Sequence, residues 1–422
     1  MLSNLKYIFK LPDLRKKLLF TLAMIAVSRV GTFIALPGIN LENMRSMFAS
    51  PNAGLLDFVN LFSGGALANF SIFSMGIIPY INASIIIQLL TIVIPQLKEL
   101  SQEGESGRKQ IAQYTRYLAL GLGFLQSLTV AISFGNNPAL VTVNVGIWWF
   151  LTSALTMVAG TAFLMWLSEL VTVNGIGNGA SLLIFVGIVS RMPTYISGTL
   201  KVLITPASYI GLIFLILMLV LVVIGIVIVT DSTRKIPVQY AKKIVGNKMY
   251  GGQATYIPLK INQGGVLPII FASSVLMFPA MLANFFPILG GLARALSAGG
   301  FWYMLVFAFL IFFFTYFYTA ITFNPKELAD NIQKYGGFIL GVRPGQPTVQ
   351  YLDKIISQLT FLGATFLALI TILPTITANL TKIYTFMGLG GTALLIMVGV
   401  ALDLMRQIDT VVVNSKYEGL IR

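Results

Sequence analysis

The sequence contains no cysteine and no histidine, and only 10% of its 422 residues are charged. Without cysteine and histidine the chain can form no disulfide, no Cys/His metal site and no Ser-His or Cys-His nucleophile pair. The composition does not exclude a catalytic site built from Asp and Glu carboxylates. Soluble domains carry roughly 25% charged residues, so this chain has too few polar side chains to cover a water-facing surface.

Apolar residues replace the missing charge, at 56% of the chain and a mean hydropathy of +0.85. A spanning helix needs about 20 mostly apolar residues, and the apolar runs here are far longer than the roughly 10 residues of a barrel strand. We therefore predict an all-α integral membrane protein with ten transmembrane helices, at 18–37, 71–94, 113–134, 146–171, 179–198, 208–230, 266–286, 301–323, 357–378 and 386–406. The first run leads into further spans, so we expect it to stay rather than to be removed as a signal peptide.

The basic residues lie mainly on one side of these spans. Ten spans put both termini on the same side, and the segments on that side hold 22 of the 28 Lys and Arg residues, against five on the other side. Positive residues mark the cytoplasm, so we predict a multi-pass protein of the bacterial cytoplasmic (inner) membrane with cytoplasmic termini. Arg29 lies inside the first span, where we expect a structural role and a bond to a carbonyl or a polar neighbour.

Ten spans divide into two groups of five, and an odd number per group inverts the second group in the membrane. We predict an N-terminal half at 1–200 and a C-terminal half at 201–422. This is an argument from parity, because the halves share no persuasive sequence identity. Inverted repeats commonly place a pathway at their interface.

Two long inside loops, 231–265 and 324–356, interrupt the second half. In the first loop we predict β-strands at 236–240 and 255–261 and a turn at 248–252. Both loops are basic. This charge has two possible explanations: the general excess of basic residues on the cytoplasmic side, or a docking surface for an acidic or RNA-containing partner.

The stretch between Gly54 and Pro95 contains a single charged residue, Asp57. It is too long for one span and too short for two spans joined by a free loop. We predict a short half-helix near 55–67, a glycine hinge, and a full helix from about Ser71. A helix that stops inside the membrane must be buried in protein or line a cavity. The alternative is an interfacial helix that lies flat outside the membrane.

Few other polar groups lie in the spans. Ser84 and Gln88 are four residues apart and share a helix face. These polar groups fit either hydrogen bonding between helices or a contact at which this helix must separate from its neighbour. The near-absence of mid-membrane charge disfavours a small-solute transporter, and we find no paired carboxylates for an intramembrane protease. The run 104–109 lacks the spacing of a phosphate-binding loop.

Eight motifs, in order along the whole chain, resemble the SecY/Sec61 family. They lie at 62–67 with 76–90, 103–108, 113–116, 175–179, 239–242, 324–327, 341–345 and 390–392. The resemblance implies a central subunit with two inverted five-helix halves around an hourglass pore. Unfolded secretory polypeptides pass through such a pore, and transmembrane segments leave it sideways into membrane lipid.

The resemblance also implies which partners the chain has and that it carries out no enzymatic reaction of its own. The chain is expected to be no enzyme and to need no cofactor or metal. Energy is expected from the SecA ATPase or from the ribosome, whose rRNA the basic loops would contact. SecE and SecG are the expected small membrane subunits, and signal peptides and nascent polypeptides are the expected cargo.

The family match assigns roles to single positions. A constriction ring, with Ala180 beside it, is expected from Ile77, Ile81, Ile184, Ile270 and Ile396. A plug that closes the pore is expected to include Leu55, Asp57, Phe58, Leu61, Phe62, Gly64 and Gly65. A lateral gate, between the second and third spans and the seventh and eighth, is expected to include Asn82, Ser84, Gln88, Gln126, Ser273 and Ser274. Docking of the motor or ribosome is expected from Arg234, Lys235, Tyr240, Lys242, Lys243, Lys248 and Arg343.

Three positions depart from the family pattern. Asn69 follows the plug glycines, where Arg or Lys is frequent, which puts a hinge-side contact in doubt. The loop around Thr233 is poorer in arginine than is usual, and Tyr256 stands where histidine is frequent. We expect partner affinity at this loop to differ, with the direction left open.

Overall fold

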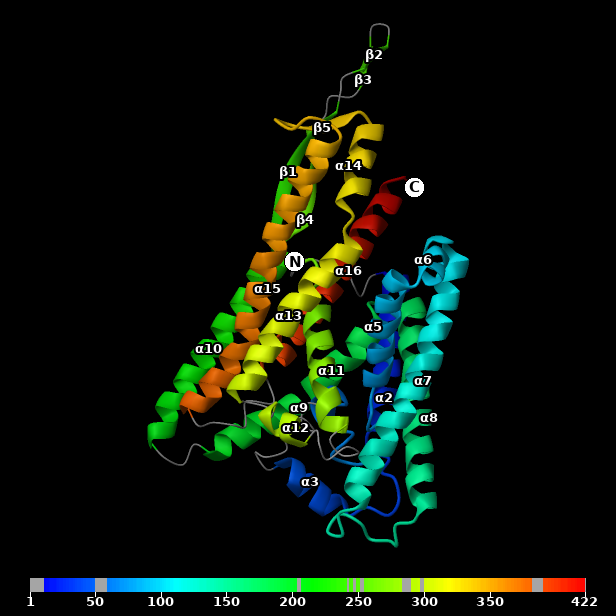
Figure 1. Ribbon diagram of the computed structural model, residues 1–422, viewed down its shortest axis with the longest axis vertical. Coiled ribbons are helices and arrows are strands. Elements are labelled where there is room, and N and C mark those ends of the chain that lie inside the picture. The colour runs from blue at the N-terminus through cyan, green and yellow to red at the C-terminus, as the bar shows by residue number, and fades with distance from the viewer. Residues whose placement is uncertain are drawn as a thin grey trace.

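The structure, a computed structural model, describes residues 11–49, 59–202, 206–240, 243–245, 248–250, 254–282, 290–296, 300–381 and 390–421. Most of these residues are helical. A small sheet, the short helix α14, helix α6 and the end of α16 lie at one end of the molecule, and the short helices α3 and α12 lie at the other (Figure 1).

The first group of helices packs around α8. Its long members are α2 (Pro12–Gly31), α5 (Ile78–Val93), α7 (Glu105–Gly135), α8 (Ile147–Asn174) and α9 (Gly179–Val202), and its short members are α3 (Leu41–Ala49) and α6 (Pro95–Gln102). Helix α7 lies between α5 and α8, and α2 and α9 also contact α8. Pro95 opens α6 and turns the chain by 102° from α5, because the residue before a proline is driven out of the helical region.

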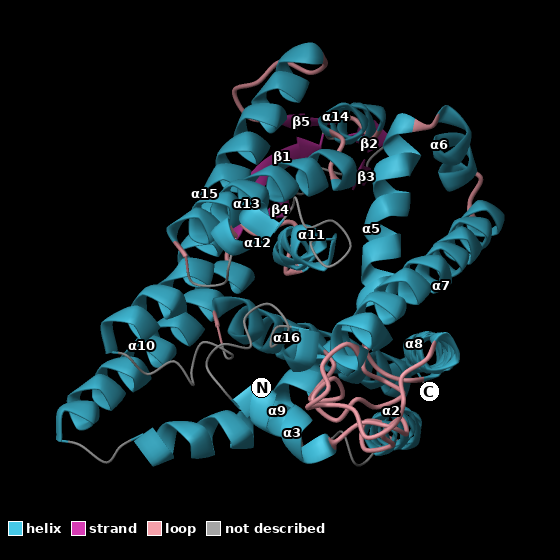
Figure 2. Ribbon diagram, turned by 60° about the horizontal axis from the view of Figure 1, so that its bottom comes forward, coloured by secondary structure: helices cyan, strands magenta, loops and turns pink. Residues whose placement is uncertain are grey.

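The second group packs around α15. Its long members are α10 (Pro206–Asp231), α11 (Leu267–Leu282), α13 (Phe301–Thr322), α15 (Gln346–Thr381) and α16 (Gly391–Ile421), and its short members are α12 (Gly290–Ala295) and α14 (Pro325–Lys334). Contacts between α9 and α16 and between α5 and α11 join the two groups. Helix α11 lies between α13 and α5 (Figure 2).

Six of the described helices are long and apolar enough to cross a membrane, and the bent pair α5–α6 passes the same test as one unit. Helix α11 carries a shorter apolar stretch, Leu267–Leu276. The first and last predicted spans fall on α2 and α16. The described part of the chain is therefore a helical protein with several membrane-spanning segments.

Several helix ends differ from the predicted spans. Helix α15 begins at Gln346 rather than at 357, and α16 continues to Ile421 rather than ending near 406. Helix α2 ends at Gly31, and the backbone of Leu36 instead donates to Phe70 O at 2.9 Å. Hydropathy marks the part of a helix that can lie in lipid, whereas backbone hydrogen bonding decides where the helix begins and ends.

The first long loop forms the predicted strands. β1 (Thr233–Tyr240) pairs antiparallel with β4 (Ala254–Lys260), with Thr233 opposite Lys260. Ile236 and Val238 point inward and pack with residues of α14 and α15. The predicted turn at 248–252 is wrong in its first part, because Lys248–Tyr250 is strand β3 and pairs with β2 (Lys243–Val245). Tyr250 belongs to the aromatic residues that are enriched in strands.

One strand was not predicted. β5 (Gly337–Ile339), in the second long loop, pairs with Val238–Tyr240 of β1. The two basic loops therefore share one three-stranded sheet in the order β4-β1-β5.

Candidate functional site in the core of the bundle

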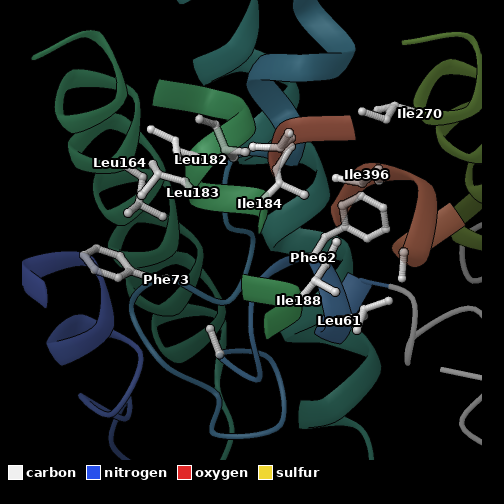
Figure 3. Close-up of a cluster of buried hydrophobic side chains, with 14 of the residues drawn as sticks. Leu61, Phe62, Phe73, Leu164, Leu182, Leu183, Ile184, Ile188, Ile270 and Ile396 are labelled. Atoms are coloured by element: carbon white, nitrogen blue, oxygen red, sulfur yellow. The ribbon is translucent and has the colours of Figure 1, made fainter. Parts of the chain in front are cut away.

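Four of the five predicted ring isoleucines lie in one buried cluster. Ile77 precedes α5, Ile184 lies on α9, Ile270 on α11 and Ile396 on α16, and none of them exposes more than 8% of its surface. Ile81 and Ala180 are partly buried and pack against the same cluster. Branched aliphatic side chains from four elements thus meet at one place (Figure 3).

Two predicted plug residues complete this cluster. Leu61 and Phe62 are 2% and 6% exposed and belong to it together with Ile188 of α9. In Figure 3, the ring of Phe62 lies next to Ile396 and near Ile184. Leu55, Asp57 and Phe58 lie outside the described residues.

The chain around the plug glycines is less helical than predicted. Only residues 59–62 of the predicted half-helix are described as helix, and turns occupy 63–70 and 72–77, so the next helix begins at Ile78 rather than at Ser71. Gly64 and Gly65 have φ values of +66° and +89°, which residues with a Cβ rarely adopt. The backbone N–H of Gly65 donates to Asn60 O at 2.7 Å.

Arg29 has the carbonyl and polar partners that the sequence predicted. Its Nη1 donates to Gly64 O at 3.3 Å and to Ser190 Oγ at 2.8 Å. Helix α2 thereby contacts both the glycine turn and helix α9. An arginine inside the bundle is stabilised by such partners because an unpaired charge there is costly.

Asn69, one of the three departures from the family pattern, binds an arginine from another element. Arg45 of α3 donates from Nε to Asn69 Oδ1 at 2.9 Å, and Asn69 Nδ2 donates to Thr32 O at 3.2 Å. A guanidinium therefore contacts this position from another element. Sequence motifs could not show this, because Arg45 is 24 residues away along the chain.

The next residue, Phe70, is held in an unusual backbone conformation. Its φ is +41°, the one positive value of a non-glycine residue in the described chain. Its ring is fully buried, stacks on Trp149 with ring centroids 6.0 Å apart, and meets Phe134 edge-on. These contacts hold a conformation that costs on the order of 1–3 kcal/mol, and they fix the end of the turn region to α7 and α8.

The predicted gate residues are mostly buried. Gln88 Nε2 donates to Ser84 Oγ at 3.3 Å, so the two share one face of α5 as predicted. Asn82 is buried, and its Oδ1 has no hydrogen-bond partner among the described residues. Gln126 of α7 and Ser273 and Ser274 of α11 are also buried. Ser273 Oγ donates to Ile270 O of its own helix at 2.8 Å.

The predicted docking residues lie around the sheet. Arg234 and Lys235 are exposed on β1, and Lys235 Nζ lies 4.6 Å from the ring centroid of Tyr256, so the tyrosine binds a cation of its own sheet. Tyr240 ends β1, Lys243 and Lys248 lie on β2 and β3, and Lys242 lies outside the described residues. Arg343 is exposed beyond β5, where its carbonyl accepts from Thr348 Oγ1 at 2.8 Å.

The side chains of the buried cluster are almost all apolar. Within the ranges that the structure describes, no three His, Cys, Asp or Glu side chains lie close enough to share a metal ion. The cluster is an apolar contact between helices of both groups. Leu61 and Phe62, which precede the glycine turn at Gly64 and Gly65, also pack in it.

Comparison with known proteins identifies relatives over nearly the full length. A family model described as SecY matches residues 71–405. The chain is 44% identical to the protein translocase subunit SecY of Thermotoga maritima, over 99% of this chain and 97% of the relative. It is 42% identical to the protein of the same name from Escherichia coli, over 98% and 95%.

Solved structures show the same fold. The structure described as "The structure of a protein conducting channel" aligns with a TM-score of 0.65 at 20% identity, over 93% of this chain and 91% of that chain. "Sec61 in the Canine ribosome-channel complex from the endoplasmic reticulum" aligns with a TM-score of 0.62 at 18% identity, with the same coverage.

Proposed function

Because this chain belongs to the SecY family, we propose that it is the channel-forming subunit of a protein translocase in the cytoplasmic membrane. Unfolded secretory polypeptides pass through it, and transmembrane segments leave it sideways into lipid. The observation that carries this proposal is the cluster of four isoleucines from four elements, closed by Leu61 and Phe62. A pathway for many side-chain types needs such a deformable apolar constriction rather than a specific binding site.

The proposed architecture has ten spans in two halves, 1–200 and 201–422, with both termini in the cytoplasm. In this proposal the five long helices of each group are its five spans. The basic sheet lies at the end that carries most of the positive charge, and the positive-inside rule places that end in the cytoplasm.

The isoleucine ring is the proposed seal. Narrow apolar constrictions shed water, and ions cannot cross without their hydration shells. Leu61 and Phe62 pack in the same cluster, and we propose that they fill the ring when the channel is closed. A passing polypeptide displaces this plug, and the ring side chains, which are linked to four different helices, adjust around it.

The proposed lateral gate lies where α5 and α7 face α11 and α13. The buried Asn82 oxygen without a described partner weakens the packing of this seam, since an unsatisfied buried polar atom costs about 1–3 kcal/mol. Apolar segments of about 20 residues then enter lipid by partitioning.

Energy comes from outside the chain, from SecA or the ribosome, and SecE and SecG complete the complex. Exposed Arg234, Lys235 and Arg343 around the three-stranded sheet are the proposed contacts. Guanidinium and ammonium groups there pair with carboxylates of a motor or phosphates of rRNA. Both loops contribute strands to one sheet, so a partner meets them as one surface.

The pore assignment is tested with single cysteines, because the natural chain has none. Ile81→Cys and Ile184→Cys are placed in the ring, and Leu217→Cys, on α10 with 63% of its surface exposed, serves as the lipid-facing control. A stalled secretory precursor carries one cysteine in its middle. Because a disulfide needs Cα atoms within about 7 Å, we expect crosslinks at both ring positions during SecA-driven transit and none at Leu217.

The outcomes of this experiment are distinct. Absence of ring crosslinks in vesicles that still translocate would show that the polypeptide takes another path. Absence of translocation with well-folded chain in the complete complex would overturn the proposed function itself.

Charge reversal at the sheet tests the docking surface. We expect Arg343→Glu to lower the rate of SecA-driven translocation at least tenfold, because it replaces attraction to a partner carboxylate or phosphate by repulsion. Lys109→Glu is the control, since Lys109 is exposed on α7 and forms an ion pair with Glu105 of its own helix. An equal loss for both variants, or unchanged SecA binding for Arg343→Glu, would contradict the assignment.

A further inference from the structure

Two arginines from different helices lie against the glycine turn of the plug. A Cβ on Gly64 would lie 2.4 Å from Arg29 Nη1, and a Cβ on Gly65 would lie 3.2 Å from Arg191 Cδ and 3.4 Å from its Nη1. The first arginine comes from α2 and the second from α9, next to Ser190, which binds Arg29. The glycines thus leave room for two guanidinium groups on adjacent residues of the turn.

Neither positive charge is neutralised within the described chain. No ion pair among the described residues includes Arg29 or Arg191, and the Nε atoms of both are buried without a hydrogen-bond partner there. Arg191 also lies over the ring of Tyr195, 5.6 Å from its centroid. An arginine keeps its charge in proteins, so the turn is flanked by two permanent positive charges.

These charges are adjacent to the ring. Leu61 and Phe62, two and three residues before Gly64, belong to the buried isoleucine cluster, and so does Ile188 of α9, three residues before Arg191. Charges inside a membrane bundle are costly and as a rule functional. The hydrogen bond to the Gly64 carbonyl needs only Arg29, and the ring of Tyr195 accounts for one face of Arg191 but supplies no negative charge.

We propose that Arg29 and Arg191 form an electrostatic barrier that discriminates against cations at the plug of this channel. The inference rests on the proposed function. The apolar ring excludes ions of either sign, whereas fixed positive charge beside it excludes cations more strongly than anions. A membrane that is negative inside drives protons and metal cations into the cell, so a channel that opens repeatedly needs this second barrier whenever the seal is incomplete.

The experiment measures ion selectivity in the complete translocase, reconstituted in planar bilayers under a KCl gradient. The reversal potential of the spontaneous current gives the permeability ratio of K⁺ to Cl⁻. We expect Arg191→Gln to raise this ratio about tenfold, which corresponds to about 1.4 kcal/mol. Arg191→Lys keeps the charge but loses the planar fork of donors, and we expect it to leave the ratio unchanged.

The lysine variant separates charge from shape. A looser turn raises the size of the current in both variants, whereas only loss of charge changes the ratio. Arg29→Gln is the second variant and is expected to shift the ratio in the same direction. An unchanged ratio in both glutamine variants, or an equal shift in Arg191→Lys, would overturn the barrier.

The same preparations are assayed for SecA-driven translocation. Normal translocation with an unchanged ratio rejects the barrier and leaves the proposed function standing. Failure of the unsubstituted chain to translocate rejects the proposed function instead, so the two failures are distinguishable.

Discussion

Replacing Gly160 by leucine is expected to prevent stable assembly of the chain in the membrane. Gly160 lies on α8, and a Cβ there would lie 2.0 Å from the backbone oxygen of Ile72 and 3.1 Å from the ring of Phe73. Ile72 follows the bridge between Ala35 and Ser71, and its N–H is bonded to Ile34 O. The obstructing atom is therefore backbone that is held on two sides and cannot move aside cheaply.

The effect should grow with side-chain size. Overpacking typically costs about 1–3 kcal/mol for small additions, and we expect Gly160→Ala to fall in this range. Leucine also separates α8 from Phe73, whose ring stacks on Phe163 of the same helix at 5.9 Å. Close helix packing through small residues is a main source of association in membranes, where lipid is as apolar as the side chains.

Gly121 provides the matched control. It is also a glycine inside a long helix, α7, but nothing lies within 4 Å of a Cβ built there. Gly121→Ala and Gly121→Leu should accumulate as the natural chain does, with alanine gaining up to about 1 kcal/mol in helix propensity. Membrane levels and resistance to protease measure the outcome. Normal accumulation of Gly160→Leu, or equal loss at both glycines, would show that this close contact does not limit assembly.

The family motifs selected four isoleucines that the structure brings together, whereas the backbone around them differs from the predicted helix. Ile77, Ile184, Ile270 and Ile396 were selected by family motifs, and they lie in one cluster. Periodicity alone could not have selected them, because a spanning helix is apolar on all sides and its lipid-facing isoleucines look the same in sequence as its buried ones. Ile216, 52% exposed on α10, illustrates the difficulty.

Contacts between distant irregular segments escaped prediction for another reason. The stretch 63–77 is apolar, and an apolar run in a membrane protein predicts helix, yet turns replace helix there. Its backbone groups are bonded to the side chain of Arg29, to the backbone of Ile34 and Leu36, and to neighbouring turns rather than in helical bonds. The pairing of β5 with β1 likewise joins residues about a hundred positions apart, and no local pattern reports such a contact.

Placing a polar side chain in the ring is expected to make the closed channel leak. Ile184 is 3% exposed and lies beside Phe62 in the buried cluster. In Ile184→Asn the amide has no partner in this apolar surrounding and is satisfied only if water enters. Leaving it dry costs about 1–3 kcal/mol, so the hydrated state should become roughly 5- to 150-fold more populated.

Leu183→Asn is the control that separates a leak from a loss of stability. Leu183 is the preceding residue of α9 and is buried to 8% exposure in the same cluster, but it lies on the Leu164 side, away from Phe62 (Figure 3). Both substitutions bury an amide among apolar groups and should destabilise the fold by similar amounts.

Ion flux from vesicles that contain equal amounts of assembled complex measures the difference. We expect Ile184→Asn to raise the flux at least tenfold and Leu183→Asn to leave it near that of the natural chain. Ile184→Val, which removes one methylene and adds no polar atom, should also stay closed. Equal leaks from the two asparagine variants would mean that loose packing, rather than wetting of one ring, opens a path for ions. The position of the seal would then have to be sought elsewhere along α9, because only a residue at the narrowest point couples its own hydration to that of the pathway.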